Sequence, residues 1–317
     1  MSESLFVGVD LGGTAIKVGL CNSAGELLRK YEGPTQAADG ADAVLSNIAT
    51  YVKELVTPGT PEWDAVQGVG IGIAGFLNIP EGIIDFSPNL PFKDVPVKQI
   101  MEEKIGKPVK INNDANVAAL GEAWGGAGKN VPNVVCYTLG TGVGGGIILN
   151  DRLIEGSAGM AGELGHISIV ADLEAIQCGC GKMGCLETVS SATGIIRMAN
   201  DAVSRGDRTS LTFVEGEITA KDVIDAAKGG DEVSQRIVSR AAFYLGKSMA
   251  AVAVVVNPQR FIIGGGVSKA GEFLFSQIRE VFDKLTPDNA RKGVQIVAAE
   301  LGNDAGVVGA AGLFLRA

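Results

Sequence analysis

The stretch Leu5-Phe-Val-Gly-Val-Asp-Leu-Gly-Gly-Thr-Ala-Ile-Lys-Val-Gly-Leu-Cys21 sets the architecture expected for this chain of 317 residues. Its apolar runs at residues 5–10 and 16–21 predict two β-strands, and the glycines between them predict a tight turn. Glycine in such a turn lets the backbone come close to a ligand such as a phosphate group. The stretch therefore indicates a strand–turn–strand unit whose turn can bind.

The same arrangement occurs a second time. Residues 134–139 and 143–149 are apolar runs around Leu139-Gly-Thr-Gly142, which begins 128 positions after Leu11 of the first turn. Two such units, each followed by strands and helices, predict a duplicated α/β architecture. Residues 77–92, rich in proline, are expected to form a loop that crosses between two lobes. Further strands are expected to end near Pro34 and to lie at 66–74, 109–111 and 261–263, with helices at 41–56, 194–204, 220–227, 232–256 and 305–315, one running through Glu122 and one starting at Ser268.

The composition weighs against two classes of partner. The chain has 27 Lys and Arg against 36 Asp and Glu, a formal charge of −9, and no dense basic run. Because phosphate backbones repel such a chain, no nucleic-acid partner is expected. The longest apolar stretch, residues 249–257, is too short to span a bilayer, and no basic, apolar leader precedes the first strand. We therefore expect no membrane partner and a cytoplasmic location.

Two matches to the dinucleotide fingerprint lack its structural context. Gly70-Ile-Gly-Ile-Ala-Gly75 and Gly140-Thr-Gly-Val-Gly-Gly145 both fit G-x-G-x-x-G, but the fingerprint needs a helix directly after its glycines. A segment with Pro80 follows the first match and an apolar strand follows the second, so a nicotinamide-dependent dehydrogenase is not expected. Gly246-Lys-Ser248 fails as a Walker A motif, because Ala241 stands where the first glycine is required.

The run Asp10-Leu-Gly-Gly-Thr-Ala-Ile-Lys17 is more specific. Its glycines suit a phosphate group, Thr14 offers a hydroxyl, and Asp10 can hold the water shell of Mg²⁺. The plainer interpretation is an ordinary glycine hairpin with a surface aspartate. Further glycine runs after apolar strands, at 140–146 and 264–266, weigh against it. Together the three runs predict a nucleotide held in a cleft between two lobes.

The run Asn112-Asn-Asp114 follows a short predicted strand and precedes a helix. Asn and Asp are common helix caps, which gives the run a purely structural interpretation. In the functional interpretation, the Asp114 carboxylate is a general base toward a substrate hydroxyl. The pattern alone leaves both interpretations open.

Three of the five cysteines lie close together in Cys178-Gly-Cys-Gly-Lys-Met-Gly-Cys185, which begins twelve residues after His166, the only histidine of the chain. Three thiols and one imidazole match a tetrahedral zinc site. Buried free thiols are the alternative, and the glycines between these cysteines argue against it. Four protein ligands leave no open position, so the zinc would be structural and a zinc-dependent hydrolase is not expected. The predicted ligands are His166, Cys178, Cys180 and Cys185, and His166 can bind the metal with one ring nitrogen and a partner with the other.

Eight motifs occur together and cover essentially the whole chain. They are Asp10-Leu-Gly-Gly-Thr-Ala-Ile-Lys17, Asn113-Asp-Ala-Asn-Val-Ala-Ala-Leu-Gly-Glu122, Leu139-Gly-Thr-Gly-Val-Gly-Gly-Gly146, Glu163-Leu-Gly-His166, Cys178-Gly-Cys-Gly-Lys-Met-Gly-Cys-Leu-Glu187, Thr188-Val-Ser-Ser-Ala-Thr-Gly194, Ile263-Gly-Gly-Gly-Val-Ser268 and Leu301-Gly-Asn-Asp-Ala-Gly306. In this order they resemble the ROK family of sugar kinases and repressors. Within that family the chain resembles the bacterial glucokinases of the Gram-positive type.

The resemblance implies an actin-like ATPase fold of the ribonuclease H-like type, an α/β fold with an active-site cleft between two lobes. A small lobe at residues 1–112 would be completed by a C-terminal helix at 304–317, and a large lobe at 113–303 would carry the zinc loop. The implied activity is the ATP-dependent phosphorylation of glucose to glucose 6-phosphate, a step of glycolysis. Mg²⁺, structural Zn²⁺ and a homodimer are also implied.

The resemblance also assigns residues to roles. Asp114 would be the base for the sugar 6-hydroxyl. The implied sugar contacts are Gly75, Asn113, Asp114, Glu163, His166 and Glu187. The implied nucleotide contacts are Asp10, Leu11, Gly12, Gly13, Thr14 and Lys17 in the first turn, Gly140, Thr141, Gly142, Val143, Gly144 and Gly145 in the second, and Gly264, Gly265, Gly266 and Val267 near the adenosine.

Two other kinds of ROK protein are the alternatives. A kinase for N-acetylmannosamine, fructose or allose would share most of these hydroxyl-binding residues. A sugar-sensing repressor would carry a DNA-binding domain ahead of Asp10, where the sequence leaves no room for one. The repressor is therefore the less favoured alternative.

Overall fold

The computed structural model describes residues 4–316, and its first sheet contains the opening strand–turn–strand unit. The strand order in this sheet is β3-β2-β1-β4-β8. Neighbours β1, β2 and β3 are antiparallel, whereas β4 and β8 continue the sheet in parallel. The predicted unit of two strands around a glycine turn is thus confirmed. The strands are β1 (Leu5–Leu11), β2 (Ala15–Asn22), β3 (Leu27–Pro34), β4 (Val66–Ile73) and β8 (Val109–Asn113).

One face of this sheet is apolar and is covered by two helices. Side chains alternate between the faces of a strand, and Val7, Val9 and Ile16 point to the same side. They are completely buried in a cluster that includes α1 (Ala41–Leu55) and α3 (Val97–Ile105). Complete burial of such side chains is worth about 1.5–3 kcal/mol each. The short helix α2 (Pro61–Ala65) precedes β4.

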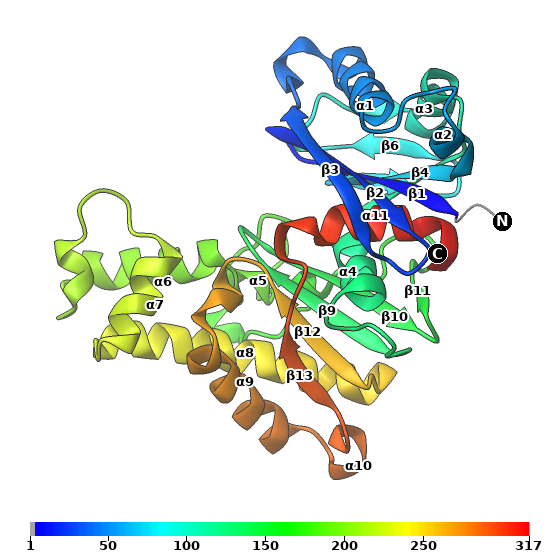
Figure 1. Ribbon diagram of the computed structural model, residues 1–317. Helices are drawn as coiled ribbons and strands as arrows, with labels where there is room; N and C mark the ends of the chain where they lie inside the picture. Colours follow the sequence, from blue (N-terminus) through cyan, green and yellow to red (C-terminus); the bar gives the residue numbers. More distant parts are fainter. Residues whose placement is uncertain (1–3, 317) are drawn as a thin grey trace. The chain divides into compact units, whose positions relative to one another are not determined.

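The opposite face of the same strands carries glycine where a side chain would otherwise stand. A Cβ atom at Gly8 would lie 1.8 Å from the carbonyl oxygen of Val307, and one at Gly70 would lie 1.8 Å from that of Ala310. Both oxygens belong to α11 (Ala305–Arg316), the last helix, which lies along these strands (Figure 1). The glycines therefore let a helix backbone rest directly on the sheet. This packing also explains the G-x-G match that begins at Gly70.

The same device joins α11 to α4 (Asp114–Gly125). A Cβ atom at Gly121 would lie 2.1 Å from the oxygen of Ala305, and one at Gly309 would lie 1.6 Å from that of Val117. The two helix backbones are consequently in contact. Because α4 begins at Asp114, this packing fixes the direction in which the helix leaves the candidate site.

Residues 77–92 are not the crossing loop that we expected. They contribute to a three-stranded antiparallel sheet of order β5-β6-β7, formed by β5 (Phe76–Asn78), β6 (Ile83–Phe86) and β7 (Lys93–Val95). Ile84 is completely buried in the same apolar cluster as the first sheet. The prediction was wrong because strands of three or four residues between prolines are too short to show a period.

The second sheet contains the repeated strand–turn–strand unit. Its order is β11-β10-β9-β12-β13, and β12 and β13 are parallel. The turn from β9 to β10 corresponds to the turn from β1 to β2, which confirms the predicted duplication. The strands are β9 (Val134–Leu139), β10 (Val143–Leu149), β11 (Arg152–Leu153), β12 (Arg260–Gly264) and β13 (Gln295–Ala298).

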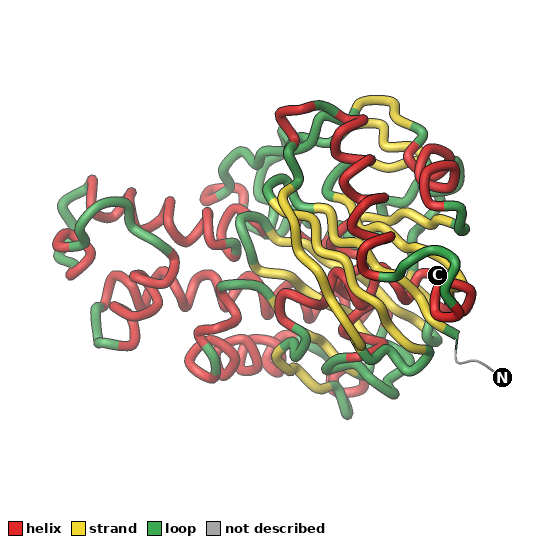
Figure 2. The backbone as a smooth tube through the Cα atoms, turned by 45° about the horizontal axis from the view of Figure 1, so that its top comes forward, coloured by secondary structure: helices red, strands yellow, loops and turns green. Residues whose placement is uncertain are grey.

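Most of the remaining chain is helical. Helices α5 to α8 pack on one another, and Figure 2 shows the outer part of this group as red helices joined by green loops. Asp231 caps the start of α8 by accepting the N–H of Ser234 (2.8 Å), and α8 has the bounds that its sequence predicted. The helices are α5 (Glu187–Ser190), α6 (Ala192–Ser204), α7 (Ala220–Lys228), α8 (Glu232–Val256), α9 (Glu272–Leu285) and α10 (Asp288–Arg291).

Helix α8 corrects the expectation that no apolar segment is long enough to span a bilayer. The apolar stretch at 249–257 belongs to this longer helix, which is the one helix of residues 4–316 that is long and apolar enough to cross a membrane by length and composition. In its most apolar window, of mean hydropathy 1.3, 67% of the residues are buried inside the protein. Such burial is typical of a core helix.

The chain divides into two compact units. The first comprises the residues up to Val134, Gly146–Gly162 and the residues from Glu300 on, and the second comprises Val135–Gly145 and Glu163–Ala299. The first unit therefore holds the N-terminal sheet together with α4 and α11. The second unit holds the helices α5 to α10 and the glycine turn after β9.

Candidate active site and metal centre

Asp114 lies where β8 ends and α4 begins, in the first unit. The Oδ1 atom of Asn113 accepts hydrogen bonds from the backbone N–H groups of Ala115 (2.9 Å) and Asn116 (3.4 Å), so Asn113 is the N-cap of α4. The Asn113 amide group can still donate to a ligand. The Asp114 side chain is exposed, and its Oδ1 atom accepts the N–H of Ala115 (2.9 Å). The capping and binding interpretations are therefore compatible at this turn.

A buried hydrogen-bond network supports the turn from below. Asn112 is completely buried, and its Oδ1 atom accepts the N–H of Asn113 (2.8 Å) and the side-chain amide of Asn116 (3.0 Å). Its Nδ2 atom donates to Oε1 of Glu155 (2.5 Å). No motif pointed to Glu155, because its partner lies 43 positions away in the sequence.

Two carboxyl groups of the first unit have raised pKa values. Desolvation raises the pKa of Asp114, although its side chain reaches solvent, and the N–H of Ala115 opposes this shift. Desolvation also raises the pKa of Asp10, and Lys17, whose Nζ atom is 3.7 Å from Asp10 Oδ2, opposes it. The charge of Asp114 is a further cause of the Asp10 shift. Asp10 also packs against α11, since a Cβ atom at Gly306 would lie 2.9 Å from Asp10 Cγ.

Thr35 holds the first glycine turn. This completely buried residue donates from Oγ1 to the carbonyl oxygen of Gly12 (2.6 Å) and from its N–H to that of Thr14 (2.9 Å). Gly12 itself donates to the oxygen of Ala15 (3.0 Å). No motif pointed to Thr35 either. Leu11 ends β1, Gly12 to Thr14 form the turn, and Lys17 lies on β2.

Gly75 follows β4 by two residues. The last residue of β4, Ile73, pairs with Asn113 at the end of β8, so Gly75 lies near the Asp114 turn. A Cβ atom at Gly75 would lie 2.6 Å from the carbonyl oxygen of Phe86. Only glycine fits this position without a shift of the β6 backbone.

The second glycine turn lies in the second unit, against Glu187. The carbonyl oxygen of Gly140 accepts the N–H of Ala192 at the start of α6 (2.9 Å). The Oε2 atom of Glu187 is 3.5 Å from the backbone nitrogen of Val143 and would lie 2.7 Å from a Cβ atom at Gly142. Gly140, Thr141 and Gly142 form the turn, and Val143, Gly144 and Gly145 begin β10.

The third glycine run meets the second one. Gly265 has a φ of +85°, and a Cβ atom there would lie 2.4 Å from the carbonyl oxygen of Leu139, the residue before the second turn. Gly264 ends β12, Gly266 follows it, and Val267 begins the 3-10 helix η5 (Val267–Ala270). Two of the three predicted nucleotide-binding runs therefore lie together in the second unit.

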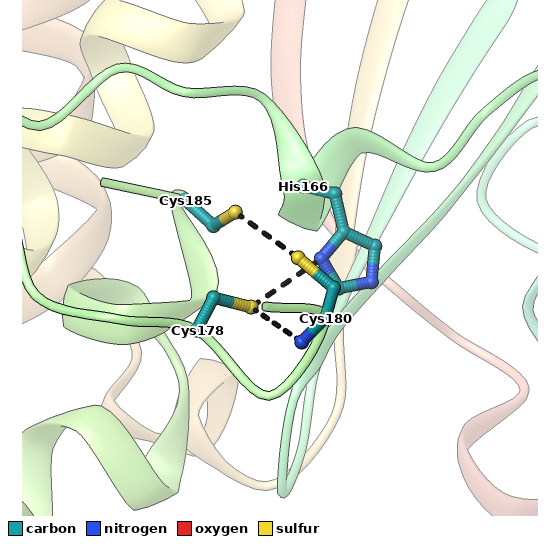
Figure 3. A group of neighbouring side chains, drawn as sticks. All are labelled: His166, Cys178, Cys180 and Cys185. Carbon is teal, nitrogen blue, oxygen red and sulfur yellow. Dashed lines mark hydrogen bonds between the residues drawn. The ribbon is translucent and has the colours of Figure 1, made fainter. Parts of the chain in front are cut away.

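Figure 3 shows the four predicted metal ligands, whose ligand atoms all lie within 4.8 Å of one another. Cys178 Sγ is 3.6 Å from His166 Nδ1, and Cys180 Sγ is 3.6 Å from Cys185 Sγ. A tetrahedral zinc ion with Zn–S distances of about 2.3 Å separates its sulfur ligands by about 3.8 Å. The donor set and its spacing therefore fit a metal ion of this kind.

His166 lies between two carboxylates. Its Nδ1 atom faces the cysteines and is 3.7 Å from Glu187 Oε1, whereas Nε2 is 3.9 Å from Glu163 Oε2. Cys178 Sγ donates to Glu187 Oε1 (2.8 Å). The three predicted sugar contacts of the second unit are thus brought together beside the metal cluster. One imidazole nitrogen faces the metal ligands and the other faces away, as a dual role requires.

A cavity of about 450 Å³ connects the metal loop with the second glycine turn. Its lining includes Thr141 and Gly142 of the turn, Cys178 of the metal loop, and Glu187. These four predicted residues of the second unit therefore border one space of ligand size. The first unit separately holds Asp10, the first glycine turn, Gly75, Asn113 and Asp114.

Comparison with known proteins gives consistent results. The model of the ROK family matches residues 6–317. A glucokinase of Halalkalibacterium halodurans is 42% identical over 98% of this chain and 94% of its own. The crystal structure of a ROK family glucokinase from Streptomyces griseus, in complex with glucose and AMPPNP, is 36% identical, with a TM-score of 0.76 over 98% of this chain and 99% of that one. The ROK hexokinase of Thermus thermophilus is 30% identical, with a TM-score of 0.82 over 97% and 96% of the two chains.

Proposed function

Since the chain belongs to the ROK family, with its actin-like ATPase fold, we propose that it is a glucokinase. It transfers the γ-phosphoryl group of ATP to the 6-hydroxyl of glucose, giving glucose 6-phosphate and ADP. The observation that carries the proposal is the likeness, over 98% of the chain, to a glucokinase whose structure holds glucose and AMPPNP. The 42% identity to a second glucokinase supports it.

Asp114 is the proposed general base. Its carboxylate accepts the proton of the sugar 6-hydroxyl while that oxygen bonds to the γ-phosphorus and the bond to the bridging oxygen of ADP breaks. The raised pKa of Asp114 supports this role, because a stronger base accepts a proton more readily. The Asn113 amide, free to donate, is the proposed partner of a neighbouring sugar hydroxyl.

The two glycine turns are the proposed phosphate contacts. Both offer backbone N–H groups, and Thr14 and Thr141 add hydroxyl donors. Residues Gly264 to Val267 are the proposed contacts of the adenosine. A desolvated carboxylate such as Asp10 is stabilised by a cation, which fits a role in holding hydrated Mg²⁺. Bound Mg²⁺ supplies charge neutralisation on the phosphates.

Zinc is the proposed occupant of the Cys/His cluster. Four protein ligands complete its coordination, so its proposed role is structural. Because Glu163, His166 and Glu187 lie at this cluster, the metal would fix the orientation of the second unit's proposed sugar contacts. Losing the metal would then weaken glucose binding more than ATP binding.

A coupled assay of ADP formation over a panel of hexoses tests the proposal. We expect glucose to give the highest kcat/KM, and N-acetylmannosamine, fructose and allose to give lower values. A clear preference for one of these three sugars would instead identify a different ROK kinase. No turnover with any hexose would contradict the kinase assignment and favour the alternative of a sugar-sensing repressor.

The assembly and location are proposed from the same resemblance. We propose a homodimer, and light scattering that gives one species at the 32.6 kDa chain mass would contradict it. We also propose a cytoplasmic location, because a cluster of free thiols suits a reducing compartment. The lobe boundary between residues 112 and 113 remains a prediction.

A further inference from the structure

A separate cavity of about 310 Å³ lies between α6 and α8 in the second unit, and arginines surround it. Four of the eleven arginines of the chain line it, although the whole protein carries a formal charge of −9. No motif in the sequence pointed to this cluster, because its members come from two separate segments, 197–205 and 236–240. They are Arg197, Arg205, Arg236 and Arg240.

Three of these arginines are held in place by carboxylates, and one is not. Each of the three ion pairs still leaves N–H donors of the guanidinium group for a ligand, since arginine has five. Within residues 4–316, the exposed Arg236 has no carboxylate at ion-pair distance, so the pocket keeps a net positive charge. The ion pairs are Arg197–Asp201 (2.8 Å), Arg205–Asp207 (3.0 Å) and Arg240–Glu174 (2.6 Å).

A further feature of the pocket points to a ligand that has a carbon part beside its anionic part. The lining also contains Ala202, Val233 and Ile237, which are buried and apolar. The polar and apolar parts of the lining therefore suit different parts of one small molecule.

We propose that this pocket binds a phosphorylated small molecule of about the size of a hexose phosphate. Arginine forks match phosphate oxygens in pairs, and Arg236 supplies the uncompensated charge. The apolar residues accept the carbon skeleton. The volume of about 310 Å³ lies at the lower end of the range of about 300–1,000 Å³ for small-molecule sites.

The pocket has a route to the proposed sugar contacts. Arg197 lines both this pocket and the cavity that contains Glu187. Its Nη2 atom donates to the carbonyl oxygen of Thr188 (3.3 Å), the residue that follows Glu187. A phosphate that binds Arg197 would therefore alter its hydrogen bond to the backbone beside Glu187. We expect this to change the KM for glucose. This second effect rests on the proposed function, whereas binding itself does not.

Calorimetric titration with inorganic phosphate and with glucose 6-phosphate tests the binding. The full-length protein is first saturated with glucose and AMPPNP, so that the proposed active site is filled. We expect one site, tighter for glucose 6-phosphate than for phosphate. Loss of one charged hydrogen bond is worth about tenfold or more in affinity, so Arg236→Gln should weaken both ligands by at least that factor. Arg236 is exposed and unpaired, so this variant is expected to fold.

Arg279→Gln is the matched control, because Arg279 forms an ion pair with Glu272 in the same unit but does not line the pocket. It should bind both ligands as the unchanged protein does. Absence of binding, or equal affinities for Arg236→Gln and the unchanged protein, would overturn the proposal. So would a variant that loses a dimer while keeping its phosphate affinity, because the pocket would then be an interface. Phosphate binding without turnover of any hexose would leave this proposal standing and contradict the kinase assignment.

Discussion

Asn112 Nδ2 lies 2.5 Å from Glu155 Oε1, and through this bond the turn that presents Asp114 is attached to the segment leading into Glu163. The same segment is closed by a hydrogen bond from the N–H of Ala161 to the carbonyl oxygen of Glu155 (3.0 Å). Asn112 therefore links the Asp114 turn to residues 155–161 within the first unit, and we expect it to be a positioning residue for Asp114.

Replacing Asn112 by leucine should lower both stability and kcat. The substitution leaves the Asn113 N–H, the Asn116 amide and the Glu155 carboxylate without their partner, and each loss costs about 1–3 kcal/mol. Urea denaturation measures the first effect and the hexose assay the second. Asn47→Leu is the control, because the Asn47 amide bonds near the surface to Thr35 O (3.3 Å) and Gln36 Oε1 (2.8 Å). Equal losses in the two variants would contradict the positioning role.

Asp114→Asn should retain the shape of the turn and lose the base. A positioned general base contributes about 10²–10⁴-fold, so kcat on glucose should fall by that amount while the KM values change little. In the unchanged enzyme, activity should decline as the pH falls through a pKa above 3.8, the ordinary value for an aspartic acid. A variant with near-normal kcat would show that another group accepts the proton.

The same substitution should raise stability at neutral pH. Because the pKa of Asp114 is higher in the folded protein than in the unfolded chain, the ionised carboxylate disfavours folding at pH 7, and this penalty disappears as the pH falls through the folded-state pKa. Asp114→Asn should therefore have the higher Tm at pH 7, with the difference shrinking toward pH 4.

Asp222→Asn provides the opposite case. Hydrogen bonds from Thr219 hold the pKa of Asp222 below its usual value, so its ionised form stabilises the fold above that value. This variant should have a lower Tm at pH 7, with the loss diminishing in acid. Thermal denaturation of both variants from pH 4 to 8 checks the two signs, and changes in the same direction would refute the argument.

Cys180→Ala should remove the metal and raise the KM for glucose more than the KM for ATP. The reason is that Cys180 belongs to the cluster beside His166 and Glu187, which are proposed sugar contacts. Metal content by atomic absorption and both KM values are the measurements. Cys136→Ala removes a buried cysteine of the same unit outside the cluster and should retain the metal. Metal loss with an unchanged glucose KM would mean that the metal stabilises the fold only.

Gly70→Ala should destabilise the protein, since its Cβ atom would lie 1.8 Å from the carbonyl oxygen of Ala310. Overpacking of this kind typically costs about 1–3 kcal/mol. Gly229→Ala is the control, because the Gly229 φ is −75° and the nearest atom to an added Cβ would be 3.3 Å away. Denaturation midpoints should separate the two variants clearly, and similar midpoints would contradict the close packing of α11.

Local patterns predicted the long elements of this fold well. The helix Glu232–Val256 has its predicted bounds, because its start has a capping aspartate and its period extends over seven turns. The role of Gly70 in β4 could not be predicted in this way. Its purpose depends on α11, which lies more than 200 residues later, and a strand glycine looks the same whether a ligand or a helix approaches it. The short strands of residues 76–95 were missed for another reason, since three or four residues are too few to show the alternation of a strand.

The same distinction between local patterns and long-range contacts decides which site residues the sequence could predict. Motifs predicted the cluster of His166 and three cysteines, because a metal site needs particular residue types, here three of them at short spacing. They indicated Asp114 as a candidate base and left open whether the run Asn112-Asn-Asp114 only caps a helix. Thr35 and Glu155 were missed, and the supporting role of Asn112 was not predicted, since their hydrogen-bond partners include residues of distant segments. The arginine pocket was missed because its arginines come from two segments, 197–205 and 236–240, that no motif connects.

The glycine face under α11 also constrains how this protein is made. The strands β1 and β4 leave the ribosome long before residues 305–316, so that face stays open to water, and to other chains, until those residues are synthesised. The first unit is therefore completed only after Val135–Gly145 and Glu163–Ala299, the whole of the second unit, have been made. A chain truncated before residue 305 would keep the proposed catalytic aspartate, but the glycine face of its first sheet would have no cover.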